Sequence, residues 1–192
     1  MMTVLPIAHI GHPILRVPTK PLTCEELASP AMQLLIDDMI DTMRHANGAG
    51  IAANQLHQSV RITVIEVNDN PRYPYKPKIP LTVLVNPTIE FLDDEMVDIN
   101  EGCLSVPNLR GTVARHVNIR ITYLDRDGNA HDEVRRGLTA GTMQHECDHL
   151  DGKLFVDLVT DPATFTTWEQ FELHHRAAFI ERITAFVDRV GS

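Results

Sequence analysis

Two histidines four residues apart, with a glutamate directly after the first, form the strongest chemical pattern in this 192-residue chain. They belong to the segment His145-Glu146-Cys147-Asp148-His149. On a helix, residues four apart lie about 40° apart around the axis and about 6 Å apart along it, so both imidazoles can bind one Zn²⁺ or Fe²⁺. In this HExxH arrangement the glutamate acts on a water as general base without binding the metal. The pattern therefore predicts a catalytic metal site on a helix.

A catalytic site of this kind needs a third protein ligand, and the sequence offers two candidates. Cys103 carries a thiol suited to either metal, although an isolated cysteine is more often a small buried side chain. Glu169 follows the histidine pair at a suitable distance, although a solvated helix charge is its simpler interpretation. Some metal sites of this kind take a third histidine six residues after the second one, but Phe155 stands at that position here, so this class of site is excluded. Spacing alone leaves the choice between Cys103 and Glu169 open.

A segment rich in small residues, Gly48-Ala49-Gly50-Ile51-Ala52-Ala53-Asn54-Gln55, lies earlier in the chain. It lacks the lysine of a P-loop, and it follows a predicted helix instead of a strand, which disfavours a dinucleotide site. Two interpretations remain. The segment is either a tight turn from helix to strand, or backbone exposed to a peptide-like ligand beside the Gln55 amide, which can donate two hydrogen bonds.

These side chains need elements to hold them, and the hydrophobic pattern predicts both helices and strands. Apolar residues at three- and four-residue steps predict a helix over 30–46 and a C-terminal helix over about 179–190, and the histidine pair lies in a predicted helix over 138–151. Alternating or β-branched runs predict strands over 61–67, 81–86, 117–124 and 131–136, the last two joined by a hairpin turn. Strands and helices without regular βαβ alternation indicate the α+β class.

Prolines recur every third residue at Pro71, Pro74, Pro77 and Pro80. This spacing suits a polyproline II segment, but a solvated loop is the favoured interpretation.

Composition excludes several classes of protein. The chain carries 17 Lys and Arg against 26 Asp and Glu, a net charge of −9, so binding of nucleic acid through a broad basic surface is not expected. A hydrophobic content of 43% excludes wholesale disorder, and the lack of a long apolar run excludes a membrane span. The length favours one domain over residues 1–192.

The cysteines and the first residues indicate the compartment. Three cysteines give no disulfide framework, which indicates reducing conditions. Cys147 is two residues from His145 and faces the opposite side of the helix, so we expect it, like Cys24, to serve packing. The N-terminus lacks the basic and apolar regions of a signal peptide, so a cytoplasmic location is expected.

Three motifs now stand in order along the chain. They are Gly48-Ala49-Gly50-Ile51-Ala52-Ala53-Asn54-Gln55, Glu101-Gly102-Cys103-Leu104-Ser105, and Gln144-His145-Glu146-Cys147-Asp148-His149-Leu150-Asp151-Gly152. Together they resemble the GxGxAAxQ, EGCLS and QHExDHLxG motifs of the peptide deformylase family, with similarity from about Ile10 to about Asp157.

The resemblance implies a fold, a metal and a reaction. Antiparallel strands would surround a central helix that bears the histidine pair, and Cys103, His145 and His149 would bind one divalent ion. The ion would be Fe²⁺, with Zn²⁺, Ni²⁺ or Co²⁺ as substitutes. The enzyme would hydrolyse the formyl group from the initiator methionine of N-formylmethionyl nascent peptides and release formate.

The resemblance also implies individual roles. Glu146 would be the base, while the Gln55 amide and the Leu104 backbone N–H would stabilise negative charge on the formyl oxygen. The peptide would bind as an extended chain near Gly50 and Arg110. An ion pair between the family positions that match Glu101 and Arg115 would brace the cysteine loop.

The chain departs from this family pattern in three places. Ala49 replaces the usual Val or Ile, and Gly141 stands in the metal helix where many relatives carry Arg. Some relatives contact the ribosome through a basic C-terminal helix, but residues 168–192 hold three arginines against four acidic residues, so charge does not support that contact here.

Three other functions remain to be distinguished. An endopeptidase that uses Glu169 would cleave internal, unformylated peptide bonds. A non-catalytic relative would need neither Glu146 nor Gln55. A redox sensor would depend on the thiols of Cys103 and Cys147, which a thiol titration with and without a chelator would test.

Overall fold

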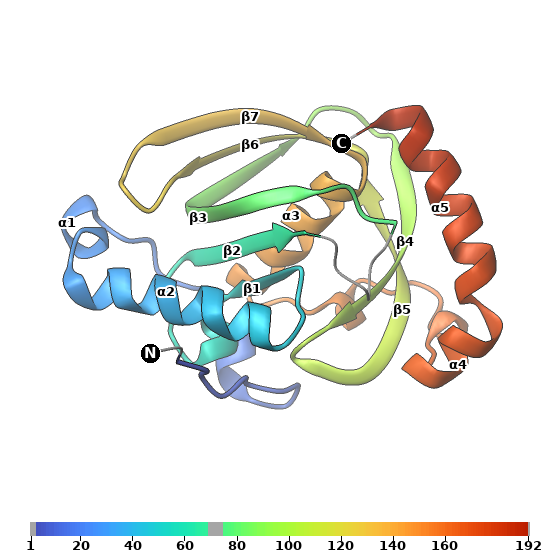
Figure 1. The fold of residues 1–192 in the computed structure, drawn as a ribbon, viewed down its shortest axis with the longest axis horizontal. Coiled ribbons are helices and arrows are strands. Elements are labelled where there is room, and N and C mark those ends of the chain that lie inside the picture. The colour runs from blue at the N-terminus through green and yellow to red at the C-terminus, as the bar shows by residue number, and fades with distance from the viewer. Residues whose placement is uncertain (1–2, 69–74, 192) are drawn as a thin grey trace.

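The computed structural model describes residues 3–68 and 75–191, so Pro71 and Pro74 of the predicted proline loop lie outside the described residues. Two antiparallel sheets flank a central helix, and further helices cover their outer faces (Figure 1). The predicted α+β class, with antiparallel strands around a central helix and a C-terminal helix, is confirmed.

The helices and strands follow one another in a simple order. The α-helices are α1 (Cys24–Leu27), α2 (Pro30–His45), α3 (Gly137–Leu150), α4 (Trp168–His174) and α5 (Arg176–Val190). The strands are β1 (Gly50–Ala52), β2 (Ile62–Val67), β3 (Ile79–Phe91), β4 (Met96–Cys103), β5 (Val106–His116), β6 (Asn118–Leu124) and β7 (Ala130–Arg136). One sheet has the order β1-β2-β3-β6-β7, and the other is the β4-β5 hairpin.

Helix α2 has the start and end that its sequence predicts. The Ser29 side chain accepts a hydrogen bond from the Met32 backbone N–H, and Pro30 occupies the first turn, where its missing N–H costs nothing. The helix ends before Asn47, whose positive φ of 52° turns the chain towards β1. Its apolar face packs against β1, β2 and β3, so the helix supports the glycine segment from behind.

Strand β3 is longer than the predicted 81–86. Asn86, with a φ of 51°, interrupts the pairing with β6 between Val85 and Thr88, and the strand then continues to Phe91. An extra residue at a β-bulge of this kind ends one register and begins another without ending the strand. The predicted end of the strand at Asn86 therefore coincides with a bulge.

Helix α3 lies between the two sheets and is buried along almost its whole length. Ala140, Met143 and Cys147 pack against the larger sheet, which confirms the packing role predicted for Cys147. Leu138 packs on the opposite side with β4 and α5. A helix enclosed on several sides positions its polar residues firmly, because they cannot turn out to solvent.

The C-terminal helices cover the outer side of the β4-β5 hairpin (Figure 1). Phe171 of α4 and Ile183 of α5 are buried against Val97 and Ile99 of β4. None of the helices in the described ranges has the length and apolar composition that crossing a membrane requires.

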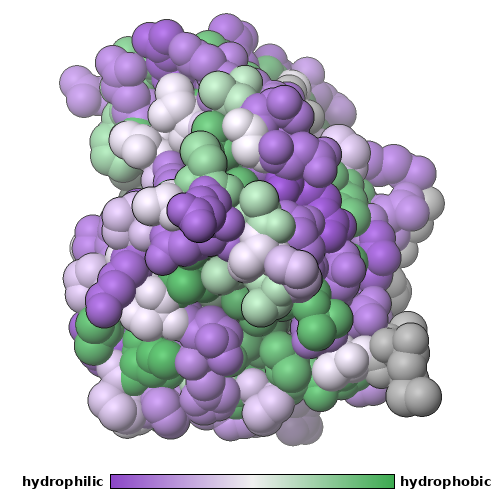
Figure 2. All heavy atoms as spheres, turned by 90° about the vertical axis from the view of Figure 1, so that its left-hand side faces the viewer, coloured by the Kyte–Doolittle hydropathy of each residue, from purple (hydrophilic) through white to green (hydrophobic). Residues whose placement is uncertain are grey.

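The prediction that Cys24 serves packing is wrong, because Cys24 is exposed in the first turn of α1. The Thr23-Glu26 capping box fixes this short helix by hydrogen bonds at its N-terminus, and Leu27 supplies its buried contact instead. The face of the molecule that carries α1 is largely hydrophilic, with hydrophobic residues more frequent in its lower half (Figure 2).

Candidate active site

Three side chains from two separate segments converge at the centre of the molecule. His145 and His149 lie one turn apart on α3, and Cys103 ends β4, the strand that passes the same helix. One potential ligand atom from each residue lies within 4.8 Å of the others, and the Cys103 Sγ is 3.2 Å from the His149 Nε2. The structure thus brings together the sulfur and both imidazoles, whereas sequence spacing alone left Glu169 as an alternative.

A network of charged side chains contacts the three candidate ligands from one side. The His145 Nδ1 lies 2.8 Å from a carboxylate oxygen of Glu101, which directs the other ring nitrogen towards Cys103 and His149. Arg115 donates two hydrogen bonds to Glu101, at 2.7 and 2.9 Å, and a third to Asp148. The expected Glu101–Arg115 pair is therefore present, and Asp148 extends it back to α3.

The protonation of these residues follows from the same contacts. Burial opposes the charge on Glu101, but Arg115 and His145 outweigh it and hold its pKa well below its usual range. Burial likewise opposes the charge on His145, but Glu101 and Cys103 raise its pKa well above the ordinary value. Burial, together with the nearby His145 and Arg115 cations, lowers the pKa of His149, which keeps that imidazole neutral.

This donor set fits a divalent transition metal. Two imidazoles and a thiol are typical ligands of Zn²⁺ or Fe²⁺. Bonds of about 2.0–2.3 Å to a tetrahedral ion separate two ligand atoms by about 3.5 Å, close to the 3.2 Å between the Cys103 Sγ and the His149 Nε2. Within the described residues, no other group of His, Cys, Asp and Glu side chains converges in this way.

Glu146 lies beside the three candidate ligands without joining them. Its carboxylate faces the pocket, where an Oε lies 3.4 Å from the Thr63 hydroxyl. A side chain at Gly50 would come within 2.5 Å of the other Oε, so glycine there makes room for this carboxylate. Burial raises the pKa of Glu146 to about 7, and the nearby His145 and Lys76 cations only partly offset that effect. A carboxylate with such a pKa suits proton transfer at neutral pH.

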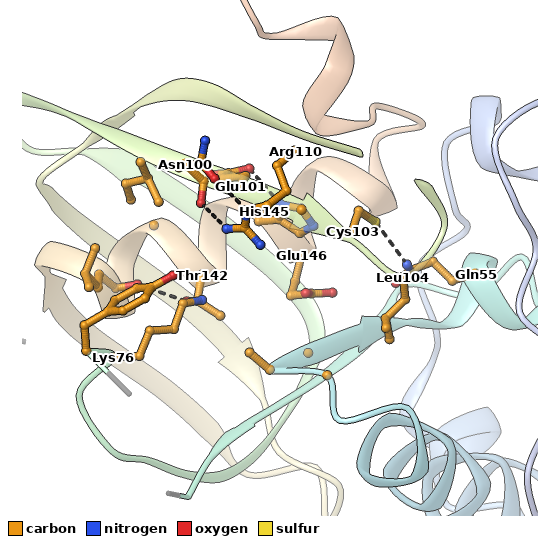
Figure 3. A pocket seen from close by; sticks show the side chains of 18 residues that line it. Gln55, Lys76, Asn100, Glu101, Cys103, Leu104, Arg110, Thr142, His145 and Glu146 are labelled. Atoms are coloured by element: carbon orange, nitrogen blue, oxygen red, sulfur yellow. Dashed lines mark hydrogen bonds and ion pairs between the residues drawn. The ribbon is translucent and has the colours of Figure 1, made fainter. Parts of the chain in front are cut away.

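Gln55 is buried with a fixed orientation. Its Oε1 accepts a hydrogen bond from the Ala52 N–H at 2.8 Å, so its amide nitrogen points the other way. The Nε2 donates to the Ser105 hydroxyl at 3.0 Å and lies 3.6 Å from the Cys103 sulfur. Gln55 therefore presents donor hydrogens to the metal site, and Leu104 lines the pocket next to Cys103 (Figure 3).

Arg110 is almost fully buried, with an exposed fraction of 1%. Its backbone N–H and carbonyl bond to Thr166, so a peptide cannot use those groups in this arrangement. Its guanidinium stacks on Trp168 of α4, 4.0 Å from the ring centre, and donates to the side chain and backbone of Asn100. The remaining nitrogen, Nη1, is buried and has no hydrogen-bond partner in the described part of the chain. Only this nitrogen is available to a ligand.

A pocket joins these residues. Its walls come from the glycine segment, the end of β4 and the face of α3, and they include every predicted site residue except His149. Several lining residues were not predicted as site residues, and two of these, Lys76 and Thr142, lie together at the end opposite Cys103 (Figure 3). Periodicity could not place Lys76, because it belongs to the proline-rich segment, for which only a loop was predicted.

Two residues considered from the sequence lie elsewhere. Glu169 is exposed on α4 and does not belong to the converging group. Cys147 is buried on the sheet side of α3, and burial raises the pKa of its thiol to about 12. The raised pKa leaves little thiolate, which disfavours a redox role for a Cys103–Cys147 pair.

Comparisons with known proteins identify the relatives of this chain. A family model described as "Polypeptide deformylase" matches residues 4–164, so α4 and α5 lie outside the match. The chain is 42% identical to "Peptide deformylase 2" of Nostoc over 168 residues. This alignment covers 88% of this chain and 93% of the Nostoc protein. It is 41% identical to "Peptide deformylase" of Pseudomonas aeruginosa over 175 residues, and this alignment covers 91% of this chain and 98% of the Pseudomonas protein.

Solved structures agree with these sequence matches. A Met-Ala-Ser-bound crystal structure of the class I type b peptide deformylase from Acinetobacter baumannii matches with a TM-score of 0.80 and 42% identity, covering 83% of this chain and all of that one. The peptide deformylase structure from Thermotoga maritima matches with a TM-score of 0.73 and 32% identity. The match covers 82% of this chain and 99% of the Thermotoga chain. This chain therefore belongs to the peptide deformylase family, the metal-dependent hydrolases that remove the formyl group from the initiator methionine of new polypeptides.

Proposed function

We propose that this chain performs the family reaction with Glu146 as general base, Gln55 and Leu104 as donors to the formyl oxygen, and Cys103, His145 and His149 as metal ligands. The observation that carries the proposal is the convergence of the three candidate ligand atoms beside the buried Glu146 carboxylate. A metal site that served folding alone would need neither this base nor the oriented Gln55 amide.

The three ligands are proposed to hold Fe²⁺, with Zn²⁺, Ni²⁺ or Co²⁺ as substitutes that fit the same donor set. When bound, such an ion supplies Lewis acidity, which lowers the pKa of water and polarises a carbonyl group. Glu101 holds the His145 Nδ1 at 2.8 Å, which would leave the other ring nitrogen of His145 to bind the ion.

Glu146 accepts a proton from the attacking water and later delivers it to the leaving amine nitrogen. Burial favours the protonated form of Glu146 and so raises its pKa, and a carboxyl group shifted in this direction can both accept and release a proton near neutral pH. The water oxygen bonds to the formyl carbon, the C–N bond breaks, and formate and a free amine result.

Negative charge on the formyl oxygen needs donors that are already in position. The Gln55 Nε2 is oriented by the Ala52 N–H, so it does not have to reorganise when charge develops. The Leu104 backbone N–H, beside Cys103 at the turn between β4 and β5, is the proposed second donor. Loss of one such donor typically raises the barrier by about 2.7–4 kcal/mol.

The peptide is proposed to bind as an extended chain beside Gly50, with the buried Arg110 Nη1 as a further donor. The bound Met-Ala-Ser in the Acinetobacter baumannii relative supports a peptide of this kind as the product.

We further propose that residues 1–192 form one catalytic domain in the cytoplasm, acting on N-formylmethionyl nascent peptides. Burial of Phe171 and Ile183 against β4 supports the inclusion of the C-terminal helices. Because α5 has a mixed charge, we expect no charge-driven contact between it and ribosomal RNA.

Hydrolysis of formyl-Met-Ala-Ser, measured with metal content on the same anaerobic sample, tests the assignment. Glu146→Gln should keep the metal and lower kcat by about 10²–10⁴-fold, the usual contribution of a general base. Glu169→Gln, which changes an exposed glutamate of α4, is the matched control and should behave like the unmodified enzyme. Unchanged turnover in Glu146→Gln with full metal content would remove Glu146 from the mechanism.

A further inference from the structure

The pocket described above has two chemically different ends. Cys103, Gln55 and Leu104 lie at one end, and Lys76 and Thr142 lie at the other (Figure 3). Thr142 precedes Glu146 by four residues on α3, so these two residues are about one helical turn, or about 6 Å, apart along that helix. The space between them is what a substrate side chain can fill.

Lys76 reaches this far end from the segment that precedes β3. Its Nζ donates a hydrogen bond to the Thr142 hydroxyl at 2.9 Å. That hydroxyl in turn lies 3.0 Å from the Leu138 carbonyl and donates to it, which leaves its lone pairs for the ammonium. The contact fixes the charged head of Lys76 on the wall of the pocket, which also includes the apolar residues Leu138 and Ile99.

The far end therefore carries a positive charge. Burial lowers the pKa of Lys76 to about 8, while Glu101 and Glu146 oppose that shift and Arg110 and Arg115 add to it. The ammonium form consequently predominates at pH 7. An ammonium group donates hydrogen bonds and accepts none, and its bond to the Thr142 hydroxyl holds this donor group on the wall of the pocket.

Substrate geometry leads the first side chain of the peptide to this charge. In a formyl peptide, that side chain branches from the Cα atom, two bonds from the formyl carbon. A formyl group held beside Glu146 and Gln55 thus places the first side chain in the same pocket. The residues of α3 that line the pocket run from Glu146 back through Thr142 to Leu138, so a side chain that follows this wall ends beside Lys76.

We propose that Lys76 is a specificity-determining residue whose ammonium donates a hydrogen bond to the tip of the first substrate side chain. The inference rests on the proposed function of the neighbouring site. It extends the substrate class to formylated peptides whose first side chain ends in a strong acceptor, with methionine sulfoxide as the example. The bonds made and broken are those of ordinary formyl hydrolysis.

Three first residues of similar length separate this role from general packing. Norleucine has no acceptor, methionine has the weak acceptor of a thioether, and methionine sulfoxide has a strongly polar oxygen. A wholly apolar pocket rejects the sulfoxide, because its oxygen would lose hydrogen bonds to water. A pocket that ends in an ammonium compensates for that loss.

The test compares kcat/KM for formyl-norleucine-Ala-Ser, formyl-Met-Ala-Ser and formyl-Met-sulfoxide-Ala-Ser. The measured quantity is the ratio of the sulfoxide to the norleucine value in the unmodified enzyme, in Lys76→Met and in Lys78→Met. Lys78 is exposed two residues along the same segment and is the control. Lys76→Met should lower the ratio about tenfold or more, the size of one charge-assisted hydrogen bond, and Lys78→Met should not.

A purely structural role for Lys76 would lower all three values in parallel and leave the ratio unchanged, which would overturn the proposal. If Lys76→Met does not fold, the unmodified enzyme still decides the question through product inhibition. Met-sulfoxide-Ala-Ser must then inhibit more strongly than norleucine-Ala-Ser, and the reverse order would also overturn it. Absence of turnover with formyl-Met-Ala-Ser itself would instead refute the proposed function.

Discussion

Replacement of Gly50 by alanine should impair catalysis through a single contact. A Cβ atom at this position would lie 2.5 Å from the Glu146 Oε1 and 2.8 Å from its Cγ. Gly50 does not have a positive φ, so alanine fits the strand backbone and the clash with Glu146 is the main effect. Glu146 is buried, so its side chain cannot avoid the new methyl group by turning out to solvent.

The size of the effect follows from the distance. Ordinary contact with a Cβ begins at 3.4 Å, so the Glu146 oxygen must move by about 0.9 Å. A misplacement of about 1 Å in a catalytic group can cost about 10²-fold in rate, or about 2.7 kcal/mol in barrier. Overpacking should also lower the free energy of unfolding by about 1–3 kcal/mol. The ligand residues are not in this contact, so metal content should stay the same.

The assay is kcat for formyl-Met-Ala-Ser, with metal content measured on each sample. Glu146→Ala serves as a second variant, since it removes the Cγ, Cδ and Oε1 atoms that the Cβ atom of Gly50→Ala would contact. The double variant Gly50→Ala/Glu146→Ala should then be no slower than Glu146→Ala alone. If the losses of kcat in the two single variants simply add in the double variant, Gly50 does not act through Glu146. The same conclusion would follow if the Gly50→Ala enzyme were as fast as the unmodified one.

Two further predictions concern the metal and the stability of the fold. Cys103→Ala should lose most of its bound metal in elemental analysis while the far-UV circular dichroism stays that of the folded chain; full metal loading would refute the proposed ligand set. Glu66, held by two hydrogen bonds from Arg44, has a lowered pKa in the folded protein, so its contribution to stability is present above its unfolded pKa of about 4.5 and is lost as the pH falls. Urea unfolding should therefore show Glu66→Gln to be less stable than the unmodified chain at pH 7 by under about 1 kcal/mol, with the difference shrinking at pH 3; an equal difference at both pH values would contradict this sign.

The parts of the site that lie in short sequence motifs could be predicted from the sequence. His145 and His149 converge because a helix places residues four apart on one face, whatever the rest of the fold does. The bounds of α2 were likewise readable, since the Ser29 cap, the residues after the helix and the apolar periodicity act locally. The third ligand was different, because spacing could not choose between Cys103 and Glu169 until the family motif was considered.

The parts that depend on long-range pairing could not be predicted. Strand β5 contains Pro107 and Gly111, which locally suggest a break, yet pairing with β4 keeps it extended. Lys76 enters the pocket only because the start of β3 lies beside α3, a contact between residues 66 positions apart. No periodic pattern encodes such a contact.

The buried charges around Glu101 connect these two kinds of information. Arg115 on β5 reaches both Glu101 on β4 and Asp148 on α3, and Glu101 reaches His145. Each of these residues would be costly to bury alone, and removing one partner of a buried pair typically costs about 3–5 kcal/mol. The net stabilisation from such a pair is often small, so its main effect here is geometric. The same arginine holds both the strand that ends at Cys103 and the helix that carries the two histidines. The three candidate ligands are therefore positioned relative to one another before a metal binds.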